Sequence, residues 1–113
     1  MHELSLIYQV VKTVEGVLKE QNLSELEQIS LDIGEMTDVV PKFIEEAWNA
    51  CRESTPFPNA KIQINVTRAK AKCQKCGYTD YVKYFDYECP ECKSSDLKII
   101  SGREFEIKEI LAK

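Results

Sequence analysis

The spacing of four cysteines constrains the fold of this chain more than any other feature of its sequence. They form two Cys-x-x-Cys pairs separated by twelve residues: Cys73, Cys76, Cys89 and Cys92. Two cysteines at this spacing can bend into a tight turn that presents both thiolates to one ion, and two such turns complete the tetrahedral sulfur shell that Zn²⁺ favours. Because four sulfur ligands leave no position open for water, the pattern predicts a structural zinc site rather than a hydrolytic one.

The segment that carries these cysteines is too short to fold by burying apolar side chains alone. Residues 69–96 fall below the length at which domains hold together without a metal or disulfides. Zinc binding, worth on the order of 10 kcal/mol, would order the segment, with iron or a dithiol redox pair as the alternatives. The odd total of five cysteines argues against a disulfide framework. We therefore expect a zinc-ribbon-like insert at residues 69–96.

Hydrophobic periodicity predicts a second unit on either side of this insert. Apolar residues recur at helical spacing over residues 4–20 and 40–51, whereas they alternate with polar residues over 29–33, 61–68 and 97–110. Gly34 is expected to end the first strand, and Gly102 to turn the chain within the last stretch. The order of elements predicts an α+β domain from residues 1–68 and 97–113, with two helices packed on a small mixed sheet.

Local signals predict the ends of the helices. Asn22 tolerates the left-handed conformation that ends a helix, so it should stop the first one. Pro41 suits the first turn of the second helix, with Thr37 or Asp38 as its cap. The expected apolar stripe of this helix comprises Val40, Phe43, Ile44, Ala47, Trp48 and Cys51. Because free cysteine is among the most buried residue types, Cys51 is expected to pack in the core rather than bind metal.

The distribution of charged residues along the chain argues against some classes of binding partner. Residues 1–60 carry four Lys and Arg against eleven Asp and Glu, whereas residues 61–113 carry eleven against eight. This balance argues against a general nucleic-acid binder, which normally has a strongly basic face. Lysines are interleaved with aromatic residues inside the insert. These aromatics could stack on unpaired nucleic-acid bases, but we favour the interpretation that they form the small core of the insert. No stretch has the length or the leader pattern of a membrane span or secretory signal, so we expect a cytoplasmic protein.

The only histidine lies at position 2, next to the amino terminus. The Met1 amine, the His2 imidazole and intervening backbone nitrogens can close chelate rings around one ion, an arrangement that suits Ni²⁺ or Cu²⁺. Glu3 could add an oxygen ligand. A solvated, frayed terminus is the alternative interpretation. Nothing else in the sequence assembles a nucleophile, a base and an open metal position, so we do not expect an enzyme.

From Met1-His2-Glu3 through LDIGEMTDV to CQKC and CPEC, essentially the whole chain resembles the HypA family, the nickel metallochaperones of [NiFe]-hydrogenase maturation. The resemblance implies that His2 is the central nickel ligand, helped by the Met1 amine and by Glu3, while the four cysteines hold structural zinc. It also implies the HypB GTPase and the precursor of the hydrogenase large subunit as partners, with urease as a second recipient for some members. Some members carry histidine beside the zinc cysteines, but here Gly77 and Lys93 follow the pairs, so we do not expect a histidine-linked switch at the zinc site.

Three questions stay open at the level of sequence. A zinc-ribbon module that binds nucleic acid or protein is the alternative function, and in it His2 is incidental. Glu35 or Asp38 could complete or gate the nickel shell, although helix capping and favourable charge at a helix start explain them equally well. The oligomeric state is not determined, and a homo-oligomer is one option.

Overall fold

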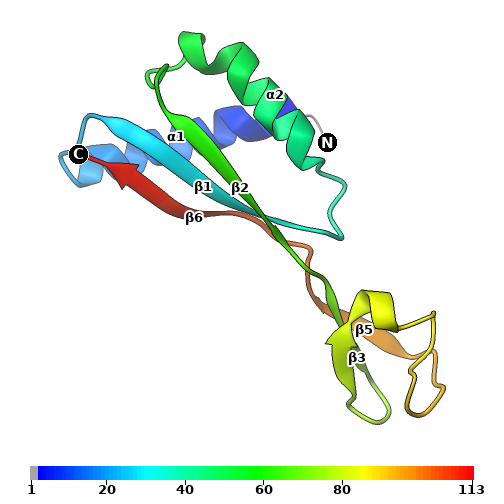
Figure 1. Ribbon diagram of the computed structural model, residues 1–113. Coiled ribbons are helices and arrows are strands. Elements are labelled where there is room, and N and C mark those ends of the chain that lie inside the picture. The colour runs from blue at the N-terminus through cyan, green and yellow to red at the C-terminus, as the bar shows by residue number, and fades with distance from the viewer. Residues whose placement is uncertain (1–2) are drawn as a thin grey trace.

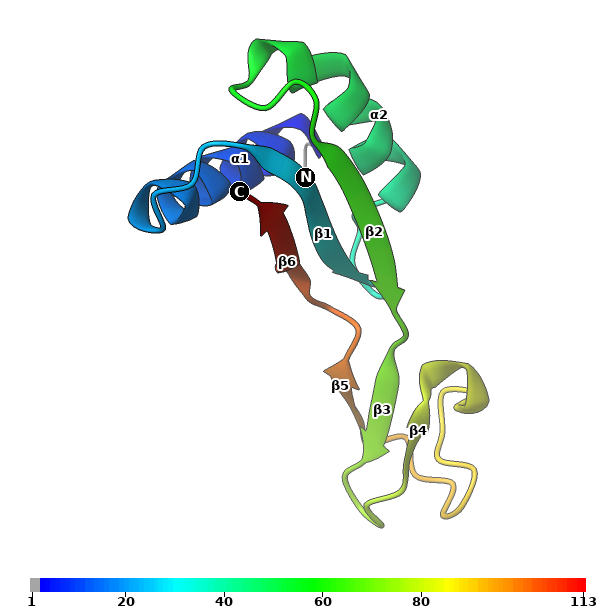
Figure 2. The ribbon, with the colours of Figure 1, turned by 60° about the vertical axis from the view of Figure 1, so that its left-hand side comes forward.

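The computed structural model describes residues 3–113, so Met1 and His2 lie outside the described residues. The molecule is elongated, with extents of 54 × 27 × 17 Å, and consists of two lobes joined by two narrow chain crossings (Figures 1 and 2). We call residues 3–67 and 105–113 the large lobe and residues 70–101 the cysteine lobe. The elements are α1 (Glu3–Glu20), β1 (Leu26–Gly34), α2 (Pro41–Cys51), the 3₁₀ turn η1 (Arg52–Ser54), β2 (Lys61–Thr67), β3 (Lys70–Cys73), β4 (Thr79–Tyr81), the 3₁₀ turn η2 (Val82–Tyr84), β5 (Leu97–Ser101) and β6 (Phe105–Ala112).

The large lobe confirms the predicted α+β class. Its sheet has the strand order β2-β1-β6, with β1 parallel to β2 and antiparallel to β6, which makes it mixed. Both helices lie on one side of this sheet (Figure 1). No helix among residues 3–113 is long and apolar enough to cross a membrane.

The core of the large lobe lies between the sheet and the helices. Ile29, Leu31 and Ile33 of β1 are fully buried, and the register places an apolar residue of β2 and one of β6 beside each of them. Trp48 of α2 is 2% exposed, and its indole N–H donates to the Ala60 carbonyl at 3.0 Å. The helix residues that complete the core are Leu6, Ile7, Val10, Val11, Val14, Leu18, Ile44 and Cys51.

The helix ends partly match the prediction. Asn22 adopts a φ of 56° just after α1, as expected for a left-handed stop. The predicted caps of α2 are wrong, because the residue at the N-cap is Val40 and no side chain caps the helix. The Thr37 hydroxyl instead donates to the Gly34 carbonyl at 2.9 Å. Val40 and Phe43, predicted on the buried stripe, are 41% and 49% exposed, whereas Ile44, Trp48 and Cys51 form the buried face of α2.

The cysteine lobe has a sheet of its own, with the order β4-β3-β5. Both neighbours run antiparallel to β3. Residues 97–101, predicted as part of the large unit, form β5, which pairs with β3, so the small sheet extends past the expected boundary at residue 96. The cysteine lobe therefore begins with β3 and ends with β5, and these two strands pair with each other. Its first and last residues, Lys70 and Ser101, are partners in this ladder.

The crossings between the lobes form a closely packed junction of residues 34–36, 67–69 and 102–104. The Glu35 N–H donates to the Thr67 carbonyl at 2.8 Å, and the Met36 N–H donates to the Gly102 carbonyl at 2.7 Å. A Cβ atom on Gly34 would collide with the Gly102 carbonyl, so the absence of a side chain permits this approach. The junction thus ties the end of β1 to both chains that enter the cysteine lobe.

Candidate metal centre

Each cysteine pair lies on a turn of the same geometry. The residue that follows each pair has a left-handed backbone, with φ of 80° at Gly77 and 65° at Lys93. In the first turn the Gly77 N–H donates to the Cys73 carbonyl at 3.0 Å, and in the second the Lys93 N–H donates to the Cys89 carbonyl at 2.9 Å. These equivalent turns present the sulfurs of each pair to the same point.

The four sulfurs converge as the spacing predicted. All Sγ atoms lie within 4.8 Å of one another, with Cys73 and Cys92 at 3.5 Å and Cys76 and Cys89 at 3.6 Å. Tetrahedral coordination with Zn–S bonds near 2.3 Å requires sulfurs about 3.8 Å apart, so this donor set fits a Zn²⁺-sized ion. No disulfide links any cysteine, and residues 3–113 contain no second group of three or more ligand side chains gathered in this way.

The pKa values of the Cys73 and Cys76 thiols are shifted in opposite directions. The backbone N–H of Cys76 donates to the Cys73 sulfur at 3.5 Å and is the main reason that the pKa of Cys73 falls to about 6. A hydrogen bond from the Tyr78 amide lowers the pKa of Cys76. Burial and hydrogen bonds with the neighbouring cysteine sulfurs outweigh this effect and raise the pKa to about 12. A bound cation would favour the thiolate form of all four sulfurs, because thiols must lose their protons to ligate a metal.

Two aromatic residues form a small cluster in the cysteine lobe. Phe85 is buried, and its ring centroid lies 5.7 Å from that of Tyr78. The Tyr78 hydroxyl donates to an Asp80 carboxylate oxygen at 2.9 Å. Tyr84 and Tyr87 are 55% and 91% exposed, so they add little to the small core. The expected aromatic core thus consists mainly of Tyr78 and Phe85.

The predicted nickel ligands are not brought together by what the structure describes. Met1 and His2 lie outside the described residues, and Glu3 is the first residue of α1. Buried Leu6 and Ile7 anchor the first turns of this helix. The nickel site therefore stays a prediction.

Glu35 has a partner that the sequence analysis missed. One of its carboxylate oxygens accepts a hydrogen bond from the Ala69 N–H at 2.9 Å, where the chain enters the cysteine lobe. The two residues are 34 positions apart in sequence, and no local pattern signals such a contact. Asp38 lies in the exposed loop between β1 and α2.

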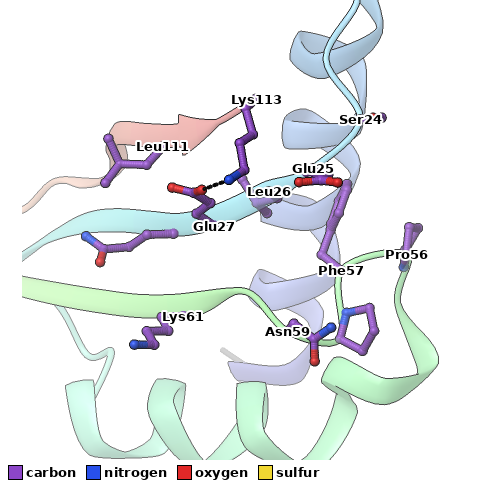
Figure 3. A pocket seen from close by; sticks show the side chains of 12 residues that line it. Ser24, Glu25, Leu26, Glu27, Pro56, Phe57, Asn59, Lys61, Leu111 and Lys113 are labelled. Atoms are coloured by element: carbon purple, nitrogen blue, oxygen red, sulfur yellow. Dashed lines mark ion pairs between the residues drawn. The ribbon is translucent and has the colours of Figure 1, made fainter.

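A groove of about 690 Å³ lies at the end of the large lobe (Figure 3). It lies between the start of β1, the end of β6 and the loop at residues 56–59. The Lys113 ammonium and the Glu27 carboxylate form an ion pair at 3.1 Å beside it, and this contact raises the pKa of Lys113. Glu3 and the four clustered cysteines are not among the described residues that line this groove.

Comparison with known proteins matches the chain over nearly its whole length. The family model described as "Hydrogenase/urease nickel incorporation, metallochaperone, hypA" covers residues 1–112. The Hydrogenase maturation factor HypA of Moorella thermoacetica is 31% identical over 107 residues, 95% of either chain. The factor of the same name from Methanocaldococcus jannaschii is 31% identical over 116 residues, covering 96% of this chain and 94% of its own.

Two solved structures share the fold. The solution structure of the nickel metallochaperone HypA from Helicobacter pylori superposes with a TM-score of 0.70 at 20% identity and covers 99% of this chain and 97% of its own. A second solution structure of a HypA protein has a TM-score of 0.77 at 22% identity, with coverage of 100% and 97%. The arrangement of a large lobe and a cysteine lobe is therefore shared across low sequence identity.

Proposed function

This chain belongs to the HypA family of metallochaperones for nickel incorporation, and from this premise we propose that it binds Ni²⁺ at its amino terminus and delivers it during [NiFe]-hydrogenase maturation. The observation that carries the proposal is the family match over residues 1–112, which includes Met1-His2-Glu3. The central ligand is the His2 imidazole, joined by the Met1 amine and by Glu3.

The position of α1 supports this assignment. The helix begins at Glu3 and is anchored by its buried face, so Glu3, one of the proposed ligands, lies on a fixed element. The positive end of a helix dipole disfavours a cation. The Glu3 carboxylate in the first turn offsets this charge, and deprotonated backbone nitrogens would offset it further.

The two proposed metal sites have different chemistry. The cysteine site holds Zn²⁺, which maintains the structure of its lobe because four thiolates close its coordination sphere. Amine, amide and imidazole nitrogens suit Ni²⁺, and a site at a terminus opens more easily than a closed sulfur shell. A carrier needs both properties, since it must keep its own fold while it releases its cargo.

The proposed partners follow from the same family role. They are the HypB GTPase and the precursor of the hydrogenase large subunit, and urease is the alternative recipient that the family description includes. We place the protein in the cytoplasm, where such precursors mature. The domain division at residues 69–96 is proposed as well, with the pairing of β5 indicating an extension to residue 101.

The test is a calorimetric titration of Ni²⁺ into the untagged chain with its cysteine site loaded with Zn²⁺. We expect one tight site that is lost in His2→Ala and in a variant with extra residues before Met1. A variant with the same extension after Lys113 is the matched control and should bind normally. Equal binding in all four proteins would overturn the amino-terminal site.

Nickel binding should depend on pH. Because the imidazole must be deprotonated to bind, and its reference pKa is about 6.5, occupancy should fall markedly between neutral pH and about pH 5.5. Equilibrium dialysis of the wild-type chain across this range measures the loss. Unchanged occupancy would exclude His2 as a ligand.

A further inference from the structure

The two faces of the small sheet carry different side chains. Paired residues project to the same face, and the register pairs Lys72 with both Thr79 and Lys98. Lys70 precedes Lys72 by two positions in β3, so it projects to the same face. Arg68 lies just before β3, and its guanidinium lies over the ring of Tyr81, the ladder partner of Lys70. The opposite face carries residues such as Ala71 and Cys73, which are buried. We call the exposed set Arg68, Lys70, Lys72 and Lys98 the basic face.

Nothing within the described part of the chain neutralises the basic face by direct pairing. Lys72 lies directly opposite Lys98, and like charges at such positions destabilise a sheet. None of the four cations forms an ion pair with a carboxylate of residues 3–113; the pair that is present there joins Lys113 to Glu27. The pairing of Lys72 with Lys98 therefore costs stability.

Asp80 is the acidic residue that these cations influence, but it is already engaged. Its carboxylate accepts hydrogen bonds from the Tyr81 N–H at 2.7 Å and from the Tyr78 hydroxyl at 2.9 Å. These two bonds are the main causes of its lowered pKa, and Lys70 and Arg68 contribute less. Asp80 is paired with Ala71, so it projects to the face opposite the cations.

Tyr81 orders part of the basic face. The Arg68 guanidinium lies 3.9 Å from the centroid of the Tyr81 ring, and the Lys70 ammonium lies 5.3 Å from it. Such cation–π contacts hold long side chains in place and reduce the entropy lost when they bind a ligand. The cations are thus partly arranged before any partner arrives.

We propose that the basic face is a docking surface for an acidic, extended segment of a partner protein. Residues two apart along a strand are spaced by about 6.7 Å. Lys70 and Lys72 of β3 follow this spacing, and carboxylates at alternate positions of an extended segment repeat at the same interval. The surface is independent of nickel, so its test does not depend on the amino-terminal site.

Charge favours a protein segment over a nucleic acid. Residues 68–103 carry eight Lys and Arg against five Asp and Glu, whereas the rest of the chain carries seven against fourteen. Four cations are few beside the 6–10 or so phosphate contacts of many nucleic-acid binders, and the acidic large lobe would repel a long polyanion. Arg68 covers a face of the Tyr81 ring, so that face is closed to base stacking.

The test measures binding of a fluorescent peptide of about ten residues with Glu at alternate positions. It uses the full chain with its cysteine site loaded with Zn²⁺, at low ionic strength, with fluorescence anisotropy as the readout. The key variant is Lys98→Glu, and the control is Lys108→Glu, which makes the same change in net charge at an exposed position of β6. A peptide with Gln for Glu and a single-stranded oligonucleotide of equal charge serve as comparators.

We expect Lys98→Glu to weaken peptide binding by about tenfold and Lys108→Glu by less than about twofold. The thermal midpoint of Lys98→Glu should not fall, because the substitution places opposite charges across the β3–β5 ladder. Equal losses in both variants, or tighter binding of the oligonucleotide than of the acidic peptide, would overturn the proposal. Self-association of the wild type that Lys98→Glu abolishes would identify a second copy as the occupant and would overturn it too.

Discussion

Gly34 controls how closely the lobes can approach. A Cβ atom at this position would meet the Gly102 carbonyl, and one at Gly102 would meet Ala69 Cα at 2.5 Å, with Gly102 also at a φ of 99°. These contacts involve backbone atoms, which cannot rotate away as a flexible side chain can. The junction therefore tolerates no side chain at either position.

Gly34→Ala should lower the free energy of unfolding by about 2 kcal/mol or more, because the substitution overpacks the junction. Gly16→Ala is the matched control. No heavy atom lies within 4 Å of the added Cβ in α1, so helix propensity should raise the free energy of unfolding by about 0.5–1 kcal/mol. Urea unfolding measures both free energies. An unchanged free energy of unfolding in Gly34→Ala would show that the backbone of the junction can shift to accommodate a side chain.

Cys51 should behave differently from the other four cysteines. Burial raises its pKa and leaves little thiolate at neutral pH. In metal-loaded protein we expect little alkylation at any cysteine. Chelation should expose four thiols to iodoacetamide, while Cys51 reacts only after a denaturant is added. Mass spectrometry counts the modified residues, and early modification of Cys51 would contradict its place in the core.

At the scale of elements, α2 begins without a side-chain cap. Val40 occupies the N-cap with φ −93° and ψ 118°, and its side chain cannot accept a hydrogen bond from the first helical N–H groups. Ser or Asp would be favoured at such a position. The helix is held instead by its buried face and by Pro41 in its first turn.

Val40→Ser should stabilise the chain by about 1 kcal/mol, since the hydroxyl can cap the helix. The same substitution at Val66 is the control, because Val66 is 54% exposed on β2 and offers no helix end. There the lower strand propensity of Ser should cost about 0.5 kcal/mol. Thermal unfolding compares the two variants. A change in stability of the same sign in both would show that capping does not determine the effect of Val40→Ser.

The elements could be predicted where one face is buried. Ile29, Leu31 and Ile33 alternate because every second residue of β1 faces the helices. Leu97 and Ile99 alternate in the same way, yet β5 pairs within the small sheet. The alternation of apolar and polar residues indicates which face of a strand is buried, but it does not indicate which strand lies beside it. The expected place of residues 97–101 therefore differs from the observed one.

At the scale of the whole molecule, the lobes depend on different sources of stability. The large lobe has a continuous core, whereas the buried residues of the cysteine lobe are few: Ala71, Cys73, Phe85 and Cys89. Such a small apolar volume cannot offset the entropy of ordering some thirty residues. The metal must supply the difference.

Chelation should therefore unfold the cysteine lobe and leave the large lobe intact. The single tryptophan, Trp48, reports on the large lobe, and four of the five tyrosines lie in the cysteine lobe. Tryptophan emission should stay unchanged while tyrosine near-ultraviolet circular dichroism is lost. Cys76→Ser should produce the same result without a chelator. A red shift of tryptophan emission in step with the tyrosine signal would show that the two lobes fold as one.

The candidate sites were predictable to different degrees. Ligand geometry at the cysteines is local, so spacing alone predicted the convergence of their sulfurs. The hydrogen bond from Ala69 to Glu35 joins distant parts of the chain, and a lone glutamate has many other roles. His2 and Met1 lie outside the described residues, so the nickel site rests on sequence and family.

The pairing of Lys70 with Ser101 has a consequence for how such a molecule can change over evolution. The cysteine lobe enters and leaves through adjacent points of one ladder, and the core of the large lobe contains no residue of it. A single deletion and a short turn between β2 and β6 would remove the lobe without opening that core. A lineage can therefore lose, exchange or enlarge this module as one genetic unit while the remaining sheet and helices keep their architecture.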